Sequence, residues 1–197
     1  MKTLLHVGCG FSNISNLKGF NVDDWSEIRL DINEKVKPDI LGTLTDMTLV
    51  ETQSVDAIYS AYNIDHIYAH EVPLALKEFH RVLKEDGIAI IRCPDIQSVC
   101  EVVAQDKLLE PLFESPIGPI FPIDILFGSR KDIAKGNEYM AKKVGFTYSV
   151  LNSLFADAGF EARYGGRIKH RWELSMVAFK QKKSEEEIRV IADPFFI

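Results

Sequence analysis

Residues Leu4-Leu5-His6-Val7-Gly8-Cys9-Gly10 combine an apolar run with a Gly-x-Gly turn. The run predicts a buried strand, and glycines at its end allow backbone conformations and a close approach of a ligand that a Cβ would prevent. Asp31 closes the second candidate strand, 21 residues after Gly10. In a doubly wound sheet, an acidic side chain at this place can accept hydrogen bonds from both hydroxyls of a ribose. Together, the turn and Asp31 indicate a ligand that contains adenosine.

Short apolar runs that end in polar or glycine-containing turns recur through the first half of the chain. Residues 72–84 differ from them, because their apolar side chains recur at spacings of three and four. Pro73 suits the first turn of a helix there, and Gly87 follows its end. Strands that alternate with such crossovers predict a parallel sheet with right-handed connections. The candidate strands are residues 3–7, 27–31, 39–41, 55–60 and 88–93.

The last third of the chain predicts one more helix and an antiparallel pair of strands. Thr147 is a candidate N-cap for a helix that ends before Gly159. Residues 160–168 and 173–181 then read as strands joined by a short turn, which is typical of a hairpin at a sheet edge. We expect a single α/β domain over residues 1–181, with a Rossmann-like, doubly wound and mostly parallel seven-stranded sheet and an antiparallel C-terminal hairpin. A C-terminal tail follows, residues 182–197; its charged residues 182–189 predict a solvated segment, whereas residues 194–197 are too apolar for a disordered end.

Residues 106–145 interrupt this regular pattern. They hold four of the eight prolines of the chain beside an apolar run at 119–127. Proline density argues against a regular helix or sheet, and a long insertion in a compact domain is often a lid or a binding loop. We expect a lid or substrate wall. The alternative is a surface excursion that packs on the core or on a second subunit.

The third residue after Gly10 separates the possible adenosine ligands. Dinucleotide sites place a further glycine there, so that the helix can pack closely while its N-terminus holds the pyrophosphate. This chain has Asn13 at that position, which disfavours an NAD(P)-dependent oxidoreductase. No P-loop sequence is present either. A non-catalytic binding or regulatory protein with the same fold stays open as a second alternative.

The five segments within residues 3–95, in this order and spacing, resemble the class I S-adenosylmethionine-dependent methyltransferases, in particular their type 11 domains. The resemblance implies S-adenosyl-L-methionine as the cofactor. It also implies methyl transfer to an oxygen, nitrogen or carbon atom of a small-molecule acceptor. The N-terminal helix that often covers the site in this family has no counterpart before the first strand, so we expect the insertion at 106–145 to close the pocket.

The resemblance also assigns the cofactor site. Asp31 matches the acidic ribose ligand, and Asp46 and Met47 match the segment that brackets the adenine. His6 stands where the family usually has an acidic residue that helps to orient the ammonium group of the cofactor. At this position the sequence departs from the family pattern. The expected cofactor-binding residues are His6, Gly8, Cys9, Gly10, Asp31, Asp46, Met47, Tyr62 and Asn63.

His66 is the candidate catalytic residue. Most of the rate of a methyl transfer can come from holding the nucleophile in line with the methyl carbon, but a neutral hydroxyl acceptor needs a base. His66 follows the fourth candidate strand, on the side expected to meet the acceptor, and an imidazole titrates near neutrality. The alternative interpretation is a histidine that is satisfied by backbone groups in a turn.

The composition is that of an ordinary globular chain. Of the 197 residues, 46% are hydrophobic and 26% are charged, and the formal net charge is −6. This charge disfavours nucleic-acid binding by broad phosphate neutralisation. No run of about 18 apolar residues offers a membrane span, and three cysteines without paired-ligand spacing support neither a disulfide framework nor a metal site. We expect a cytoplasmic protein, and the apolar insertion is compatible with a homodimer.

Overall fold

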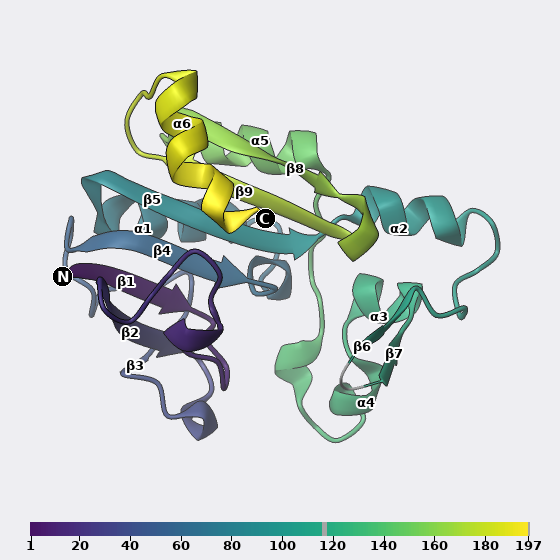
Figure 1. Cartoon of the computed structure of the whole chain (residues 1–197). Coiled ribbons are helices and arrows are strands. Elements are labelled where there is room, and N and C mark those ends of the chain that lie inside the picture. The colour runs from purple at the N-terminus through teal and green to yellow at the C-terminus, as the bar shows by residue number, and fades with distance from the viewer. Residues whose placement is uncertain (116–117, 197) are drawn as a thin grey trace.

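A computed structural model describes residues 1–115 and 118–196 of the chain. Its main feature is a seven-stranded sheet in the order β3-β2-β1-β4-β5-β9-β8 (Figure 1). The first five strands pair in parallel, and β9 pairs antiparallel with both β5 and β8. The predicted fold class is therefore confirmed. The strands are β1 (Lys2–Val7), β2 (Trp25–Asp31), β3 (Ile40–Leu41), β4 (Val55–Ala61), β5 (Leu83–Pro94), β8 (Ala162–Ile168) and β9 (Glu173–Phe179).

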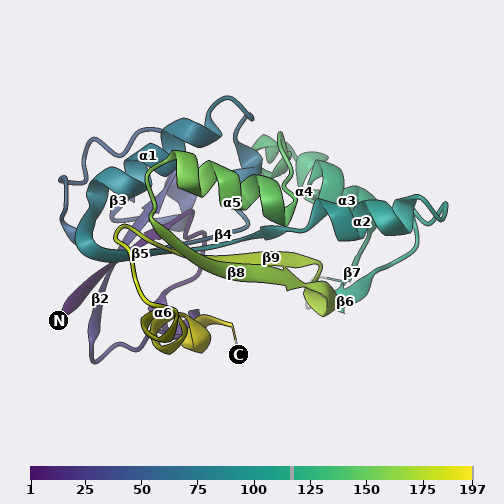
Figure 2. The same ribbon diagram turned by 90° about the horizontal axis from the view of Figure 1, so that it is seen from above.

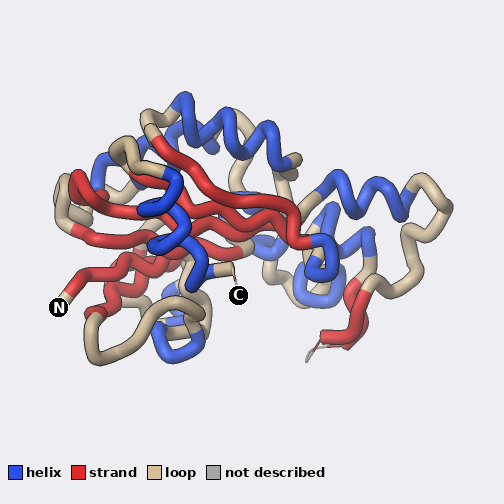
Figure 3. The backbone as a smooth tube through the Cα atoms, turned by 45° about the horizontal axis from the view of Figure 1, so that its top comes forward, coloured by secondary structure: helices blue, strands red, loops and turns tan. Residues whose placement is uncertain are grey.

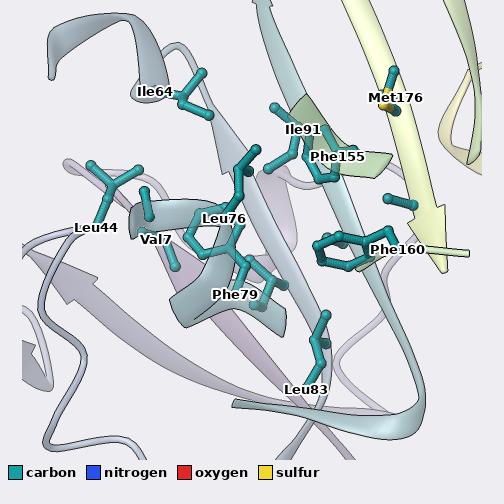
Figure 4. Close-up of a cluster of buried hydrophobic side chains, with 14 of the residues drawn as sticks. Val7, Leu44, Ile64, Leu76, Phe79, Leu83, Ile91, Phe155, Phe160 and Met176 are labelled. Atoms are coloured by element: carbon teal, nitrogen blue, oxygen red, sulfur yellow. The ribbon is translucent and has the colours of Figure 1, made fainter. Parts of the chain in front are cut away.

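One face of the sheet is covered by two helices, α1 (Val72–Val82) and α5 (Tyr148–Asp157), while the other face carries α6 (Glu185–Ala192) (Figure 2). The apolar stripe that predicts α1 is the stripe that it buries. Leu76 and Phe79 of α1 are fully buried, and they share one core cluster with strand residues such as Val7 and Ile91 (Figure 4). Burying side chains of this size contributes about 1.5 to 3 kcal/mol each. The crossovers after β1 and β2 contain only short 3₁₀ turns, Ile14–Asn16 and Glu34–Val36.

The C-terminal segment forms a helix, which the sequence pattern did not predict, and the charged residues at its start are mostly exposed. Ser184 and Glu187 form a capping box at the start of α6. This pattern is typical of a helix N-terminus, but here it lies within a run of charged residues and is easily overlooked in the sequence. Ala192 and Phe195 are buried against the second face of the sheet, and Arg92 Nη2 of β5 donates to Phe195 O at 2.6 Å. The apolar residues of this segment recur at helical spacing, so the exposed glutamates are the polar face of an amphipathic helix.

The insertion is more regular than its prolines predict. Pro122 occupies the first turn of a short helix, where a missing N–H is tolerated. Pro119 lies in a two-stranded hairpin that is separate from the main sheet. Figure 3 shows these pieces as a group beyond one end of the main sheet. The elements of the insertion are β6 (Phe113–Ser115), β7 (Gly118–Ile120), α3 (Pro122–Phe127) and α4 (Arg130–Ile133), and α2 (Ile96–Val103), which the sequence pattern did not predict, precedes it.

Candidate functional site

The turn after β1 faces the carboxylate at the end of β2. Gly10 N donates to Asp31 Oδ2 at 2.8 Å, and the second oxygen, Oδ1, accepts from Asn33 N at 2.8 Å. Gly8 and Gly10 both have positive φ angles, 66° and 52°, which glycine adopts without steric cost. A Cβ on Gly10 would meet no protein atom within 4 Å, so its backbone is open to a ligand. Each carboxylate oxygen has two lone pairs, so Asp31 keeps acceptor capacity for hydroxyl groups.

Arg29 of β2 holds the same turn from the other side. Its guanidinium donates to Gly10 O at 2.6 Å and to Ser12 O at 3.1 Å. It also donates to Val36 O at 3.3 Å and to Lys37 O at 3.0 Å, which joins the glycine turn to the crossover after β2. Sequence reasoning missed this residue, although a cation inside an apolar strand pattern is a signal that can reveal such a clamp.

His6 and Cys9 support the turn from within. His6 Nδ1 lies 2.8 Å from Glu27 Oε1, and the other oxygen of Glu27 accepts from Ile14 N at 2.9 Å. Burial lowers the pKa of His6, although Glu27 opposes the shift. Cys9 is 3% exposed, and burial raises the pKa of its thiol to about 11, so this thiol is packed and not activated.

The segment after β3 presents Asp46 and Met47 differently. Met47 is buried, and α1 fixes its backbone, because Met47 N donates to Glu78 Oε2 at 3.0 Å and Met47 O accepts from Arg81 Nη2 at 2.8 Å. Asp46 is exposed, and the backbone N–H of Thr48 holds the pKa of its carboxyl below the usual range. The two residues lie beside a cleft of about 180 Å³, which is lined by Ile40, Leu41, Gly42, Thr43, Asp46, Met47, Thr48 and Leu49.

The turn after β4 reaches back to the glycine turn. A Cβ on Gly8 would lie 1.9 Å from Asn63 Nδ2, so the Asn63 side chain covers Gly8 directly. Tyr62 has a φ of 53°, which is uncommon for a residue other than glycine and is typical of functional turns. Its hydroxyl donates to Glu173 Oε2 at the start of β9. Burial and the Glu173 carboxylate raise the pKa of Tyr62, so this hydroxyl stays protonated.

His66 lies in the next turn, a 3₁₀ segment at Ile64–His66. Its Nδ1 atom is 3.1 Å from Ala141 O, at the end of the insertion. A carbonyl oxygen carries no proton, so Nδ1 must be the donor and the neutral ring keeps its lone pair on Nε2. This contact satisfies one ring nitrogen by a backbone group, as the alternative interpretation expects, and it leaves the other nitrogen basic.

Buried side-chain polar atoms without a hydrogen-bond partner are confined, within the described residues, to the carboxyl edge of β4 and β5 and the adjoining start of β9. Buried polar groups in native proteins are usually hydrogen-bonded, so a cluster of unpartnered ones needs an explanation such as a bound ligand or water. The atoms are Ser60 Oγ, Asn63 Nδ2, both carboxylate oxygens of Asp65, Arg92 Nε, Glu173 Oε1 and Ser175 Oγ. The Asp65 carboxylate is nevertheless ion-paired with Lys142 at 3.0 Å, and Arg92 Nε lies 4.0 Å from Glu173 Oε1. The groups in this set that lack both a hydrogen bond and an ion pair are Ser60 Oγ, Asn63 Nδ2 and Ser175 Oγ.

The insertion lies beyond the carboxyl ends of β1, β4 and β5, where the residues above gather (Figure 1). A cleft of about 570 Å³ separates it from the end of β2, with Tyr139 on one wall and Ile32, directly after Asp31, on the other. This volume is in the range of small-molecule sites, about 300 to 1,000 Å³. The lining residues are Ile32, Asn33, Glu34, Lys35, Leu41, Lys135, Gly136, Asn137 and Tyr139.

Two features are absent from residues 1–115 and 118–196. None of the helices there combines the length and the apolar character that crossing a bilayer requires. Nor do three or more His, Cys, Asp or Glu side chains of these residues gather as a metal site would need.

Comparisons with known proteins agree with this fold. Residues 5–91 match a type 11 family model described as a methyltransferase domain. No protein with a curated description matches the sequence. Similar solved structures include three methyltransferases of low sequence identity, and they share the fold.

One of them is an S-adenosylmethionine-dependent protein from Thermotoga maritima described as a possible histamine N-methyltransferase, with 14% identity, coverage of 92% of this chain and 83% of that chain, and a TM-score of 0.57. A second is the 1,6-didemethyltoxoflavin-N1-methyltransferase of Burkholderia thailandensis with bound S-adenosylhomocysteine. It has 13% identity, coverage of 92% of this chain and 72% of that chain, and a TM-score of 0.59. A third is an S-adenosylmethionine-dependent methyltransferase from Methanosarcina mazei, with 14% identity, coverage of 92% of this chain and 93% of that chain, and a TM-score of 0.57. The resemblance that the sequence predicts is thus matched by a methyltransferase domain model over residues 5–91, and the solved structures share the fold of the chain.

Proposed function

We propose that this protein binds S-adenosyl-L-methionine at the carboxyl ends of β1, β2 and β4 and catalyses methyl transfer to an oxygen, nitrogen or carbon atom of a small molecule. The observation that carries the proposal is the 2.8 Å hydrogen bond from Gly10 N to Asp31 Oδ2. It joins the glycine turn and the acidic residue at one edge of the sheet, so a single nucleoside can contact both. The open space above Gly10 and the unpartnered Asn63 Nδ2 support the fit of such a ligand.

Each predicted cofactor residue has a role in this proposal. Asp31 accepts hydrogen bonds from the ribose hydroxyls, and Asp46 and Met47 line the adenine end. Gly8, Cys9 and Gly10 supply backbone around the amino-acid end. Since His6 is 3% exposed and bonded to Glu27, we propose that it acts on the cofactor through the turn that it supports. Tyr62 and Asn63 complete the wall from the β4 side.

His66 is the proposed general base for a hydroxyl acceptor. When bound, the cofactor supplies a methyl group made electrophilic by its positively charged sulfur. Nε2 of His66 removes the acceptor proton, because Nδ1 already donates to Ala141 O. An amine acceptor in its neutral form can react with no base, and its excess proton then leaves after the transfer. The insertion supports a lid function, since it forms one wall of the 570 Å³ cleft at this edge.

Isothermal calorimetry with S-adenosylhomocysteine tests the cofactor site. Replacing Asp31 by Ala should weaken binding by about 1.5 to 3 kcal/mol, the scale for losing hydrogen bonds to a charged group. Asp23→Ala is the matched control, because this exposed carboxylate precedes β2 and should leave the affinity unchanged. Equal affinities of the native protein and Asp31→Ala would contradict the ribose placement.

Transfer of tritium from methyl-labelled S-adenosylmethionine to a panel of small alcohols, phenols and amines tests the reaction itself. Label in an acceptor product is the expected result. Binding of S-adenosylhomocysteine without transfer to any member of the panel favours the non-catalytic alternative, and binding of NAD(P) in its place favours the oxidoreductase.

A further inference from the structure

Residues 141–144, called the strap below, return from the insertion and contact the turn that carries His66. Asp65 O accepts from Lys143 N at 2.9 Å and from Val144 N at 3.3 Å. Lys142 Nζ lies 3.0 Å from Asp65 Oδ2, and Ala141 O lies 3.1 Å from His66 Nδ1. The strap therefore holds both the backbone and the side chains of two consecutive residues in the turn.

The Asp65 carboxylate is the most constrained group at this contact. Its side chain is 1% exposed and that of Lys142 is 13% exposed, so their ion pair is largely withdrawn from solvent. A buried charge is costly unless it is paired, and removing one partner leaves the other uncompensated. The ion pair therefore fixes the position of the strap against the turn more strongly than the two backbone hydrogen bonds can alone.

The strap is in turn attached to α3 of the insertion. Lys142 N donates to Phe127 O at 3.2 Å, and Ala141 forms an antiparallel bridge with Gly128. Gly128 has a φ of 99°, and a Cβ there would lie 1.9 Å from Met140 O, so only glycine permits this close approach. The position of the insertion is thereby transmitted to the residues that touch His66.

We infer that Lys142 is a positioning residue for His66: its ion pair with Asp65 seats the strap so that Ala141 O receives the Nδ1 proton and Nε2 stays basic. The inference rests on the proposed role of His66. Lys142 touches neither the reacting atoms nor the imidazole, and it acts through the carbonyl group of the residue before it.

The tautomer of His66 is the direct readout, and it needs no acceptor. Long-range ¹H–¹⁵N spectra of histidine-labelled protein, recorded well above the ordinary imidazole pKa of about 6.5, distinguish the two neutral forms. The His66→Gln variant assigns the signal by its disappearance. The native protein should show the Nδ1–H form, and Lys142→Met should shift the ratio of the two forms by about tenfold toward Nε2–H, as expected when one hydrogen bond is lost.

Two matched variants define the outcome. Lys142→Arg keeps the charge and should restore the native ratio. Lys143→Met removes the neighbouring ammonium, which lies 4.5 Å from the Tyr68 ring centroid and not on Asp65, and should leave the ratio native. A native ratio in Lys142→Met overturns the inference, as does an equal shift in Lys143→Met.

If Lys142→Met does not fold, the double variant Lys142→Met/Asp65→Asn takes its place. It removes both charges together and leaves no unpaired buried carboxylate, and it is read by the same spectra. Calorimetry with S-adenosylhomocysteine on the native protein tests the proposed function separately from the role of Lys142. A tautomer ratio that does not change in the variant contradicts the role of Lys142, whereas absence of binding to the native protein contradicts the proposed function.

Discussion

The two halves of the candidate site are built differently. In the half formed by β1 and β2, the charged side chains are hydrogen-bonded within the protein: Arg29 donates to four carbonyl groups, Asp31 accepts from two backbone N–H groups, and Glu27 bridges His6 and Ile14. In the half formed by β4, β5 and β9, unpartnered polar atoms such as Ser60 Oγ and Ser175 Oγ lie buried.

This difference indicates a division of labour. A half whose own contacts fix it is ready for a ligand that is the same in every reaction cycle, which suits a cofactor. A half with unpartnered groups gains its missing hydrogen bonds only when something polar binds, which suits a specific acceptor. The insertion contacts the second half through Lys142 and Ala141. We therefore propose that selection of the acceptor depends in part on segments outside the residues matched by the family model.

The largest expected effect comes from Gly8, where the two halves touch. Gly8→Ala should lower the free energy of unfolding by about 2 to 4 kcal/mol, because strain at a positive φ adds to overpacking against Asn63. Gly10→Ala is the matched comparison, since its φ is also positive but its Cβ meets open space. Its cost should be about 1 to 2 kcal/mol, from strain alone. Urea denaturation measures both.

The contact between Gly8 and Asn63 can be isolated by a double variant. Gly8→Ala/Asn63→Ala removes the colliding amide and should recover part of the loss, which a double-mutant cycle reports as coupling. Equal costs for Gly8→Ala and Gly10→Ala, or no coupling, would show that the halves do not meet at this point.

A smaller effect is expected at Arg29. Arg29→Met removes donors from the carbonyl groups of the glycine turn and should cost about 1 to 3 kcal/mol of stability, together with a loss of S-adenosylhomocysteine affinity. Arg163→Met is the control, because Arg163 of β8 also donates to a carbonyl group, that of Phe160, but at the opposite edge of the sheet. It should lower stability and leave affinity native. Equal losses of affinity in the two variants would mean that the turn is not held by Arg29.

The sequence predicts the first half of the site better than the second, for a physical reason. The glycine turn and Asp31 follow strands whose apolar periodicity is local, so their place at one edge follows from the sheet itself. Lys142 and Glu173 reach the site through contacts with residues 77 and 111 positions away in the chain, Asp65 and Tyr62. No local pattern marks such pairs. The start of α6 is a related case, since Glu187 of its capping box stands within a run of charged residues that reads as a solvated segment.

The smallest expected effect concerns the internal support of the first half, and it is seen in the pH dependence of stability. Burial lowers the pKa of His6 in the folded protein, whereas the unfolded chain has the ordinary value of about 6.5. As the pH falls below that value, the unfolded chain takes up a proton that the folded protein does not, so stability falls by up to about 1.4 kcal/mol per pH unit. Burial also lowers the pKa of His80, so His6→Gln should reduce this slope without abolishing it, and the exposed His170→Gln should leave it native. If His6 and Glu27 instead form a charged pair, stability rises on acidification in the native protein and not in His6→Gln. That result would show that His6 supports the glycine turn as a charged partner of Glu27 and not as a neutral ring.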